Sequence, residues 1–233
     1  MKKIFSLLVL IYFSTQVFSQ QTDSTESKWS YSVSSDIVSR YIWRGTDYCN
    51  SPAFQPDLEI SYGNFTIGTW GSATFNSFSV QETDLFASFE VWKFKFSCWD
   101  YFYMNMDSTR NNYFNYSGNE TGHDFSFETE FTLSEKVPLK FLIAYNFFGA
   151  DTAKSTYLEL SYSLQNKVPL EFFAGFTPNQ GYSWYGNGPG FVNVGVGLTK
   201  ECKISNDYSI PVYCKLIFNP QRENVFLVAG LTF

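Results

Sequence analysis

The chain ends in the stretch "NVFLVAGLTF", residues 224–233, and this stretch decides which fold the sequence favours. Every second residue from Val225 to Phe233 is apolar, which predicts a β-strand with one face against apolar surroundings. The end of a soluble domain is usually polar and frayed unless something holds it in place. The last strand therefore faces either a protein core or a lipid bilayer.

The first residues have the pattern of a secretory signal peptide. Lys2 and Lys3 precede an apolar run from Ile4 to Phe13, and small residues follow it. A membrane anchor is the alternative, but the run is shorter than the roughly 20 apolar residues that a spanning helix needs. The expected division is a cleaved signal peptide, a polar lead and a barrel, at residues 1–19, 20–28 and 29–233.

Composition and charge narrow the class of protein further. Aromatic residues make up 21% of the chain, with 26 Phe, 16 Tyr and 6 Trp. Such an excess is typical of aromatic girdles at two membrane interfaces. Without residues 1–19, which hold two lysines and no acids, 14 basic residues face 22 acidic ones and the net charge is −8, with histidine not counted. This acidity argues against nucleic acid as a partner and against a basic membrane-binding patch.

Alternating stretches separated by turn residues continue through the rest of the chain. We expect about twelve strands, most of them near the 9 to 11 residues that cross a bilayer when tilted. Short turns, such as 63–64, alternate with longer loops, such as 105–122 and 179–190, as in bacterial outer-membrane barrels. The expected strands are 29–44, 54–63, 65–75, 82–92, 94–104, 122–133, 138–149, 156–164, 170–178, 191–201, 210–218 and 225–233.

The two faces of the expected strands differ in polarity. In the second strand, Leu58 and Ile60 share one face and Glu59 lies on the other. A soluble barrel of the lipocalin kind has the same alternation with its apolar side inward, so periodicity does not separate the two. Strand number, loop asymmetry and aromatic content favour an all-β fold, an antiparallel up-and-down transmembrane β-barrel. The barrel must be closed, because lipid cannot satisfy the backbone groups of an open edge.

The ending "VFLVAGLTF" resembles the C-terminal assembly signal of bacterial outer-membrane barrels. In those proteins the barrel-insertion machinery takes up this signal. The resemblance implies export to the outer membrane of a Gram-negative bacterium, with that machinery and the lipid bilayer as partners.

A second resemblance lies in "SDIVSRYIWRGTDYCNSPAFQPDLEISYGNFTIGTWGS", residues 35–72. It resembles the opening of the Gcw-chp or TorF-like family of porin-like proteins, which implies an outer-membrane barrel and names no substrate. Cys49 departs from the family pattern, in which we expect an ordinary polar residue. The match rests on Ser39, Arg40, Tyr41, Arg44, Gly45, Gln55, Gly68, Trp70, Gly71 and Ser72.

Candidate chemistry in the chain is sparse. His123 is the one histidine, next to Asp124 and near Ser126. Neighbours along a strand point to opposite faces, so this stretch does not assemble a serine–histidine triad. A lone histidine with no carboxylate cluster at ligand spacing offers no closed metal site. We therefore expect no enzyme activity, no metal and no cofactor.

The four cysteines allow three pairings in an exported protein. Cys202 and Cys214 lie on consecutive expected strands and are the best candidates for a disulfide. The alternative is that Cys49, Cys98 and these two are isolated thiols that pack as small apolar side chains.

The charges on the polar faces are the strongest functional candidates. If the apolar faces meet lipid, these charges line the lumen and set its selectivity for small hydrophilic solutes or ions. We expect the arginines to form the positive side of a constriction and the acids the negative side, with a mild preference for cations. The candidates are Asp36, Arg40, Arg44, Asp57, Glu59, Asp84, Glu128, Glu130 and Glu159.

The long loops support a second interpretation. A closed barrel would use loops 105–122 and 179–190 to bind a partner or a surface ligand. Tyr182, Trp184 and Tyr185 could stack on a sugar there, or lie at the outer membrane interface. Twelve strands fall between the eight that side chains fill and the sixteen that leave an open channel, so the strand number leaves both interpretations open.

Overall fold

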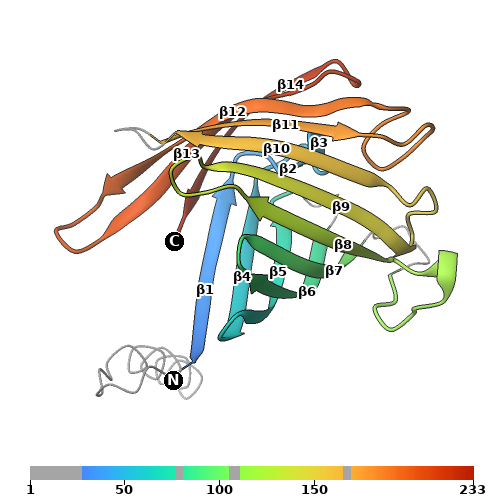
Figure 1. Ribbon diagram of the computed structural model, residues 1–233, viewed down its shortest axis with the longest axis horizontal. Helices are drawn as coiled ribbons and strands as arrows, with labels where there is room; N and C mark the ends of the chain where they lie inside the picture. The colour runs from blue at the N-terminus through green and yellow to red at the C-terminus, as the bar shows by residue number, and fades with distance from the viewer. Residues whose placement is uncertain (1–27, 77–80, 105–110, 165–168) are drawn as a thin grey trace, which may run out of the picture.

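The computed structural model describes residues 28–76, 81–104, 111–164 and 169–233. Within them, twelve strands close an antiparallel barrel (Figure 1). In the sequence, a small hairpin lies between the first two of these strands. The barrel strands are β1 (Trp29–Val38), β4 (Ala53–Tyr62), β5 (Phe65–Thr74), β6 (Gln81–Val91), β7 (Phe94–Met104), β8 (His123–Thr132), β9 (Leu139–Gly149), β10 (Thr156–Leu164), β11 (Leu170–Thr177), β12 (Gly190–Lys203), β13 (Ser209–Asn219) and β14 (Asn224–Thr232). The hairpin is β2 (Ile42–Trp43) and β3 (Thr46–Asp47), and one short 3-10 turn spans Gly118–Glu120.

The predicted all-β, up-and-down barrel of about twelve strands is confirmed. Each strand pairs with its neighbours in sequence, apart from the step over the hairpin and the closing pair β1–β14. In the described part of the chain, no helix has the length and hydropathy to cross a membrane. The expected signal peptide and nearly all of the polar lead lie outside the described residues, as does part of loop 105–122.

The first strand is the one substantial error in the predicted elements. The other eleven agree with the structure to within two residues, but the strand expected at 29–44 ends at Val38. Beyond it the chain turns, and Arg44 and Gly45 have φ angles of 48° and 78°. Left-handed backbone of this kind belongs to tight turns and not to strands. Residues 39–52 therefore leave the barrel wall.

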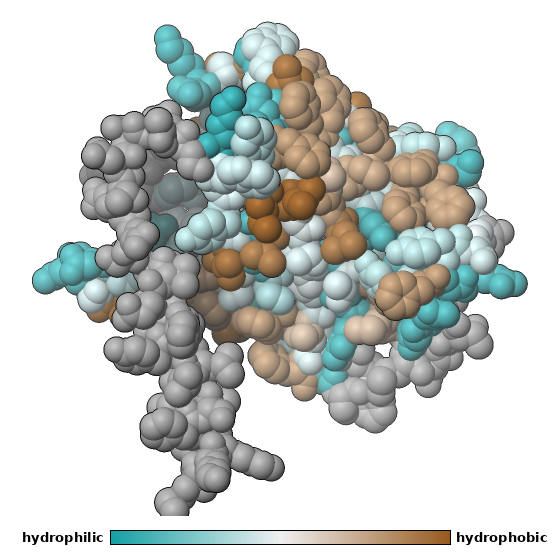
Figure 2. Space-filling view, turned by 90° about the horizontal axis from the view of Figure 1, so that it is seen from below, coloured by the Kyte–Doolittle hydropathy of each residue, from teal (hydrophilic) through white to brown (hydrophobic). Residues whose placement is uncertain are grey.

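The burial pattern shows which face of the wall is apolar. Leu58 and Ile60 are 44% and 42% exposed, whereas Gln55 on the opposite face of β4 is 8% exposed. Along β14, Leu227 is 70% exposed and the alternate residue Val228 is buried. Apolar side chains gather over much of the surface that Figure 2 presents. The wall thus carries its apolar face outward, opposite to a lipocalin-like barrel.

Aromatic side chains gather near both ends of the wall. At the end with the short turns, Trp29 packs on Tyr62 with ring centroids 4.9 Å apart, and Trp92 is 80% exposed. At the end with the longer loops, Phe176 packs on Phe191 at 5.5 Å. Two aromatic zones of this kind are typical of barrels that meet two membrane interfaces.

The joint between β1 and β14 is short. Only Asp36–Thr232, Ile37–Leu231 and Val38–Gly230 pair across it, whereas β1 and β4 share ten residue pairs. Backbone hydrogen bonds between Ser35 and Phe233 extend the joint by one step. Asp36 adds side-chain bonds, because its carboxylate accepts from the hydroxyls of Tyr213 and Thr232.

The predicted disulfide between Cys202 and Cys214 is wrong. Cys202 pairs with Ile210 and Cys214 with Leu198, which puts the two cysteines four residues apart along the β12–β13 ladder. At about 3.3 Å per residue this is about 13 Å, beyond the roughly 7 Å that a disulfide spans between Cα atoms. All four cysteines are free thiols.

Candidate functional site

Residues 39–52, here called the inner hairpin, fold into the barrel and contact its wall on several sides. Its start is fixed to β14, since Ser39 exchanges hydrogen bonds with the backbone of Ala229 at 2.8 and 2.9 Å. Tyr41 packs on Trp70 of β5 with ring centroids 5.5 Å apart. Tyr48 stacks on Tyr103 of β7 at 5.6 Å. The hairpin thus lies across the lumen between opposite parts of the wall.

The tip of the inner hairpin is pressed against the far wall. The carbonyl oxygen of Gly45 accepts a 2.9 Å hydrogen bond from the amide of Asn219, at the end of β13. A Cβ added to Gly45 would lie 1.8 Å from the carbonyl oxygen of Val192 in β12. Only glycine allows so close an approach, and only glycine adopts the local φ without strain.

Arg44, next to this glycine, forms a buried ion pair. Its Nη2 lies 2.6 Å from Oε1 of Glu128 in β8, and both side chains are less than 10% exposed. Its Nη1 donates a 2.8 Å hydrogen bond to the hydroxyl of Tyr185. Tyr101 donates to the same oxygen of Glu128 at 2.8 Å. The charge of the arginine is therefore balanced by Glu128, and both of its terminal nitrogens donate hydrogen bonds inside the barrel.

Aromatic rings enclose the guanidinium of Arg44. It lies 4.5 Å from the ring centroid of Trp43 and 4.7 Å from that of Tyr157, within the range of cation–π attraction. Burial raises the pKa of Tyr185 to about 12, so its hydroxyl stays protonated at neutral pH. The tip of the hairpin is thus a charged group held in a cage of aromatic side chains.

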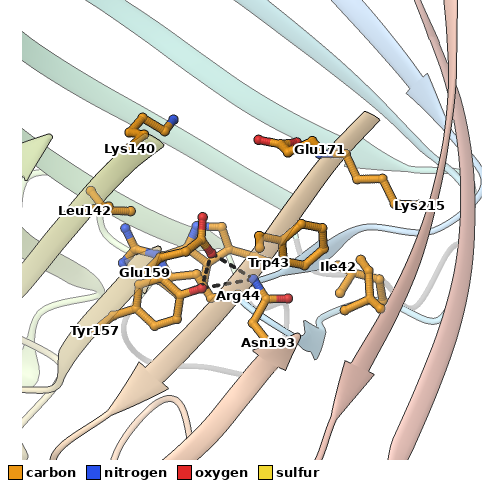
Figure 3. Close-up of a pocket in the computed structure, with 12 residues that line it drawn as sticks. Ile42, Trp43, Arg44, Lys140, Leu142, Tyr157, Glu159, Glu171, Asn193 and Lys215 are labelled. Carbon is orange, nitrogen blue, oxygen red and sulfur yellow. Dashed lines mark hydrogen bonds between the residues drawn. The ribbon is translucent and has the colours of Figure 1, made fainter. Parts of the chain in front are cut away.

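A cavity of about 320 Å³ lies beside the inner hairpin (Figure 3). Lys140 forms an ion pair with Glu130 at 3.1 Å, and Glu159 accepts a 3.0 Å hydrogen bond from Asn193. Among the described residues, Glu171 and Lys215 form no ion pair. The cavity is lined by Ile42, Trp43, Arg44, Lys140, Leu142, Tyr157, Glu159, Glu171, Phe173, Asn193, Lys215 and Ile217.

Glu171 and Lys215 lie on either side of a glycine. Glu171 of β11 pairs with Gly197 of β12, which pairs in turn with Lys215 of β13. A Cβ added to Gly197 would contact the aliphatic part of the Lys215 side chain at 3.3 Å. The lysine side chain therefore lies over the position where Gly197 has no side chain. A second cavity, of about 210 Å³, shares Ile42, Lys215 and Ile217 with the first. The lumen is therefore partly filled and contains polar space next to the hairpin.

Comparison with known families identifies the chain. Residues 21–212 match the family described as "Bacterial protein of unknown function (Gcw_chp)". The chain belongs to this family. The comparison with curated proteins gives no match. Among solved structures, a chain described as "KdgM porin" is similar over 86% of this chain and 98% of its own, with 8% identity and a TM-score of 0.48.

The Gcw_chp barrel places the predicted acidic lumen residues on the polar, inward face of its strands. Glu128 forms its ion pair with Arg44 there, and Glu130 forms its ion pair with Lys140. Asp84 accepts a 3.1 Å hydrogen bond from the backbone of Phe102. The acids and their strands are Asp36 of β1, Asp57 and Glu59 of β4, Asp84 of β6, Glu128 and Glu130 of β8, and Glu159 of β10.

The two arginines are not where the sequence placed them. Both were expected on one strand, but both lie on the inner hairpin, because the chain turns after Val38. Arg40 has a side chain that is 38% exposed, with an ion pair to Asp47 at 3.5 Å and a hydrogen bond to Asn50. Arg44 is separate from it, in the buried pair with Glu128. They do not form one positive side facing an acidic one.

The aromatic residues of loop 179–190 are also divided. Tyr182 is 76% exposed and remains available at the surface. Trp184 is partly buried and packs on Tyr103 with ring centroids 5.8 Å apart. Tyr185 is fully buried against Arg44, so the expectation that it contacts a surface ligand or the membrane interface is wrong for this residue. This part of the loop folds inward, where Tyr185 completes the aromatic cage around the guanidinium and Trp184 packs on Trp43.

His123 is fully buried and both of its ring nitrogens are occupied. Nδ1 lies 2.7 Å from a carboxylate oxygen of Asp100, and Nε2 lies 2.6 Å from the carbonyl oxygen of Tyr113. Neither nitrogen is free to accept a proton from a serine, as a catalytic base must. This histidine instead ties the end of β8 to the loop that contains Tyr113. The absence of an enzyme activity stays a prediction.

Sequence reasoning missed several residues of the site. Glu171 and Lys215 belong to strands that alternate as clearly as the others, so the same face argument would have placed them in the lumen. No sequence pattern marked Trp43, Tyr101 and Tyr157 as site residues, because only the turn at Gly45 brings them together around Arg44. The length of the strand expected at 29–44, well beyond the 9 to 11 residues that cross a bilayer, was the available sign of that turn.

Proposed function

We propose that this protein is an outer-membrane, porin-like channel that passes small hydrophilic solutes or ions through a lumen narrowed by the inner hairpin. The observation that carries the proposal is the charged cavity of about 320 Å³ enclosed by a barrel whose outer face is apolar. A polar interior within an apolar wall is the arrangement that transmembrane barrels use to hold water.

Membrane insertion is supported by the outer face itself. Val225 and Leu227 of the last strand are 59% and 70% exposed. Transfer of such side chains from water to hydrocarbon stabilises the inserted state by about 25 cal/mol per Å² of apolar surface. The same exposed strand is what the barrel-insertion machinery would take up in the outer membrane of a Gram-negative bacterium.

The ion preference follows from which charges are already paired. Arg44 and Lys140 each hold a carboxylate partner. The other charged side chains that line the cavity are one base, Lys215, and two acids, Glu159 and Glu171. The unpaired balance is acidic, which favours cations over anions at the constriction.

The first prediction concerns this balance. In planar bilayers under a salt gradient, the refolded protein is expected to show small, defined conductance steps with a cation preference. Glu171→Gln should reduce that preference, because it removes an unpaired carboxylate from the cavity, and Lys215→Gln should increase it. Glu135→Gln, on an exposed turn outside the barrel wall, is the matched control and should change nothing.

The second interpretation is a closed barrel that acts through its loops, and the buried pair of Arg44 and Glu128 favours it, because a plug so well held could block the lumen. A protein that migrates as a folded, heat-modifiable barrel and stays silent in bilayers would support this interpretation and contradict the channel. Shortening loop 179–190 would then abolish binding of the partner.

A further inference from the structure

A cluster of buried oxygen atoms lies where β8 and β9 meet the loop 150–155. Ser126 of β8 pairs directly with Asn146 of β9, and Asp124 lies two residues before Ser126 on the same face. The ladder shifts register just before Ser126. Asp151 joins these side chains from the loop. The side chains of Asp124, Ser126 and Asn146 are fully buried, and Asp151 is 4% exposed.

One neutral amide bridges the two carboxylates of the cluster. Nδ2 of Asn146 donates to Asp124 at 3.1 Å and to Asp151 at 2.9 Å. Among the described residues, no Lys, Arg or His forms an ion pair with either acid. The position between the two carboxylates thus favours a positive charge, and the neutral side-chain amide of Asn146 occupies it.

Three oxygen atoms of the cluster have no hydrogen-bond partner. They are Oδ1 of Asp124, Oγ of Ser126 and Oδ1 of Asn146, all of them buried. Buried polar atoms are almost always paired, so each of these oxygens is available to a further partner. Asp124 and Ser126 occupy neighbouring positions on one face of β8, so Oδ1 of Asp124 and Oγ of Ser126 can contact a common group.

We propose that Asp124, Ser126, Asn146 and Asp151 bind a divalent cation, with Ca²⁺ the best match. Two carboxylates, an amide and a hydroxyl form an oxygen-only donor set, which suits hard cations and not zinc. Ca²⁺ accepts irregular geometry, whereas Mg²⁺ demands a near-ideal octahedron. On binding, the amide of Asn146 turns its oxygen towards the ion.

The cation would brace the loops around the inner hairpin. Asp151 accepts backbone hydrogen bonds from Ala153 and Ser155 at 3.1 and 2.7 Å, which sets the shape of its loop. The hydroxyl of Ser155 in turn accepts a 2.9 Å hydrogen bond from the backbone of Trp184. Trp184 packs on Trp43 of the hairpin. Three successive contacts, Asp151 with Ser155, Ser155 with Trp184 and Trp184 with Trp43, therefore connect the site to the inner hairpin.

The test is calorimetric titration of the chelator-treated, refolded barrel with CaCl₂, followed by the same titration with MgCl₂. We expect one Ca²⁺ per chain and weaker binding of Mg²⁺. Asp124→Asn and Ser126→Ala should each weaken Ca²⁺ binding at least tenfold. Asp207→Asn, the same chemical change on an exposed turn, is the control and should bind as the unmodified protein does.

Two results would overturn the proposal. One is the absence of saturable Ca²⁺ binding by a protein that migrates as a folded barrel, which would mean that a proton or a water molecule satisfies the cluster. The other is binding that Asp124→Asn and Ser126→Ala leave unchanged, which would place the ion elsewhere. Neither result depends on conductance, so failure of this proposal and failure of the channel proposal are distinguishable.

Discussion

Alanine in place of Gly45 is expected to displace the inner hairpin and raise the single-channel conductance several-fold. The added Cβ would lie 1.8 Å from the carbonyl oxygen of Val192 and 2.9 Å from its carbonyl carbon. Both atoms belong to the backbone of the barrel wall, which does not move aside as a flexible side chain does. The hairpin tip must therefore withdraw from the wall, which opens the lumen that it now crosses.

Gly63→Ala provides the matched control for this experiment. Gly63 has a φ of 60°, close to the 78° of Gly45, and a Cβ there would meet no atom within 4 Å. The two substitutions share the cost of a left-handed alanine, about 1 to 2 kcal/mol, and differ only in the clash. Equal conductance of the two variants in planar bilayers would show that the hairpin does not limit the pore.

Replacing Arg44 by alanine should lower the free energy of unfolding by about 3–5 kcal/mol. The change leaves Glu128 buried without its partner, and an uncompensated buried charge has a cost of this size. It also removes the cation–π contacts with Trp43 and Tyr157. Urea titration of the tryptophan fluorescence, on protein refolded into lipid vesicles, measures the effect.

Two further variants separate the buried charge from a general loss of packing. Adding Glu128→Gln to Arg44→Ala should recover part of the lost stability, because a neutral amide is less costly to bury than an unpaired carboxylate. Lys140→Ala breaks the ion pair with Glu130, whose side chains are 42% and 28% exposed. It should cost less than about 1 kcal/mol. A larger loss from Lys140→Ala than from Arg44→Ala would contradict the assignment of Arg44 as the buried anchor.

The sequence predicts the wall of this barrel well, for a physical reason. Each strand pairs with strands that are close to it in the sequence. A wall with one apolar face also requires apolar residues at every second position of each strand. The alternation of Leu58, Glu59 and Ile60 therefore predicts both the strand and which residues share its apolar face. The period leaves open which face lies outward, and the exposure of Leu58 in the structure decides that point.

The interior of the barrel is where prediction from the sequence stops. Arg44 meets Glu128 and Tyr185, which lie 84 and 141 residues away along the chain. No local pattern records such contacts. The stretch around Arg40 and Arg44 continues the polar–apolar alternation of β1. The alternation therefore does not show that this stretch leaves the barrel wall, and only the turn at Gly45 does.

The short joint between β1 and β14 also gives the barrel a mechanical weak point. The inner hairpin leaves β1 directly after this joint, and Ser39, its first residue, is bonded to β14. A slip of β1 along β14 by two residues would keep every side chain on its own face. At about 3.3 Å per residue, such a slip would carry the base of the hairpin about 7 Å along the wall. A displacement of β1 along β14 would therefore be transmitted directly to the inner hairpin.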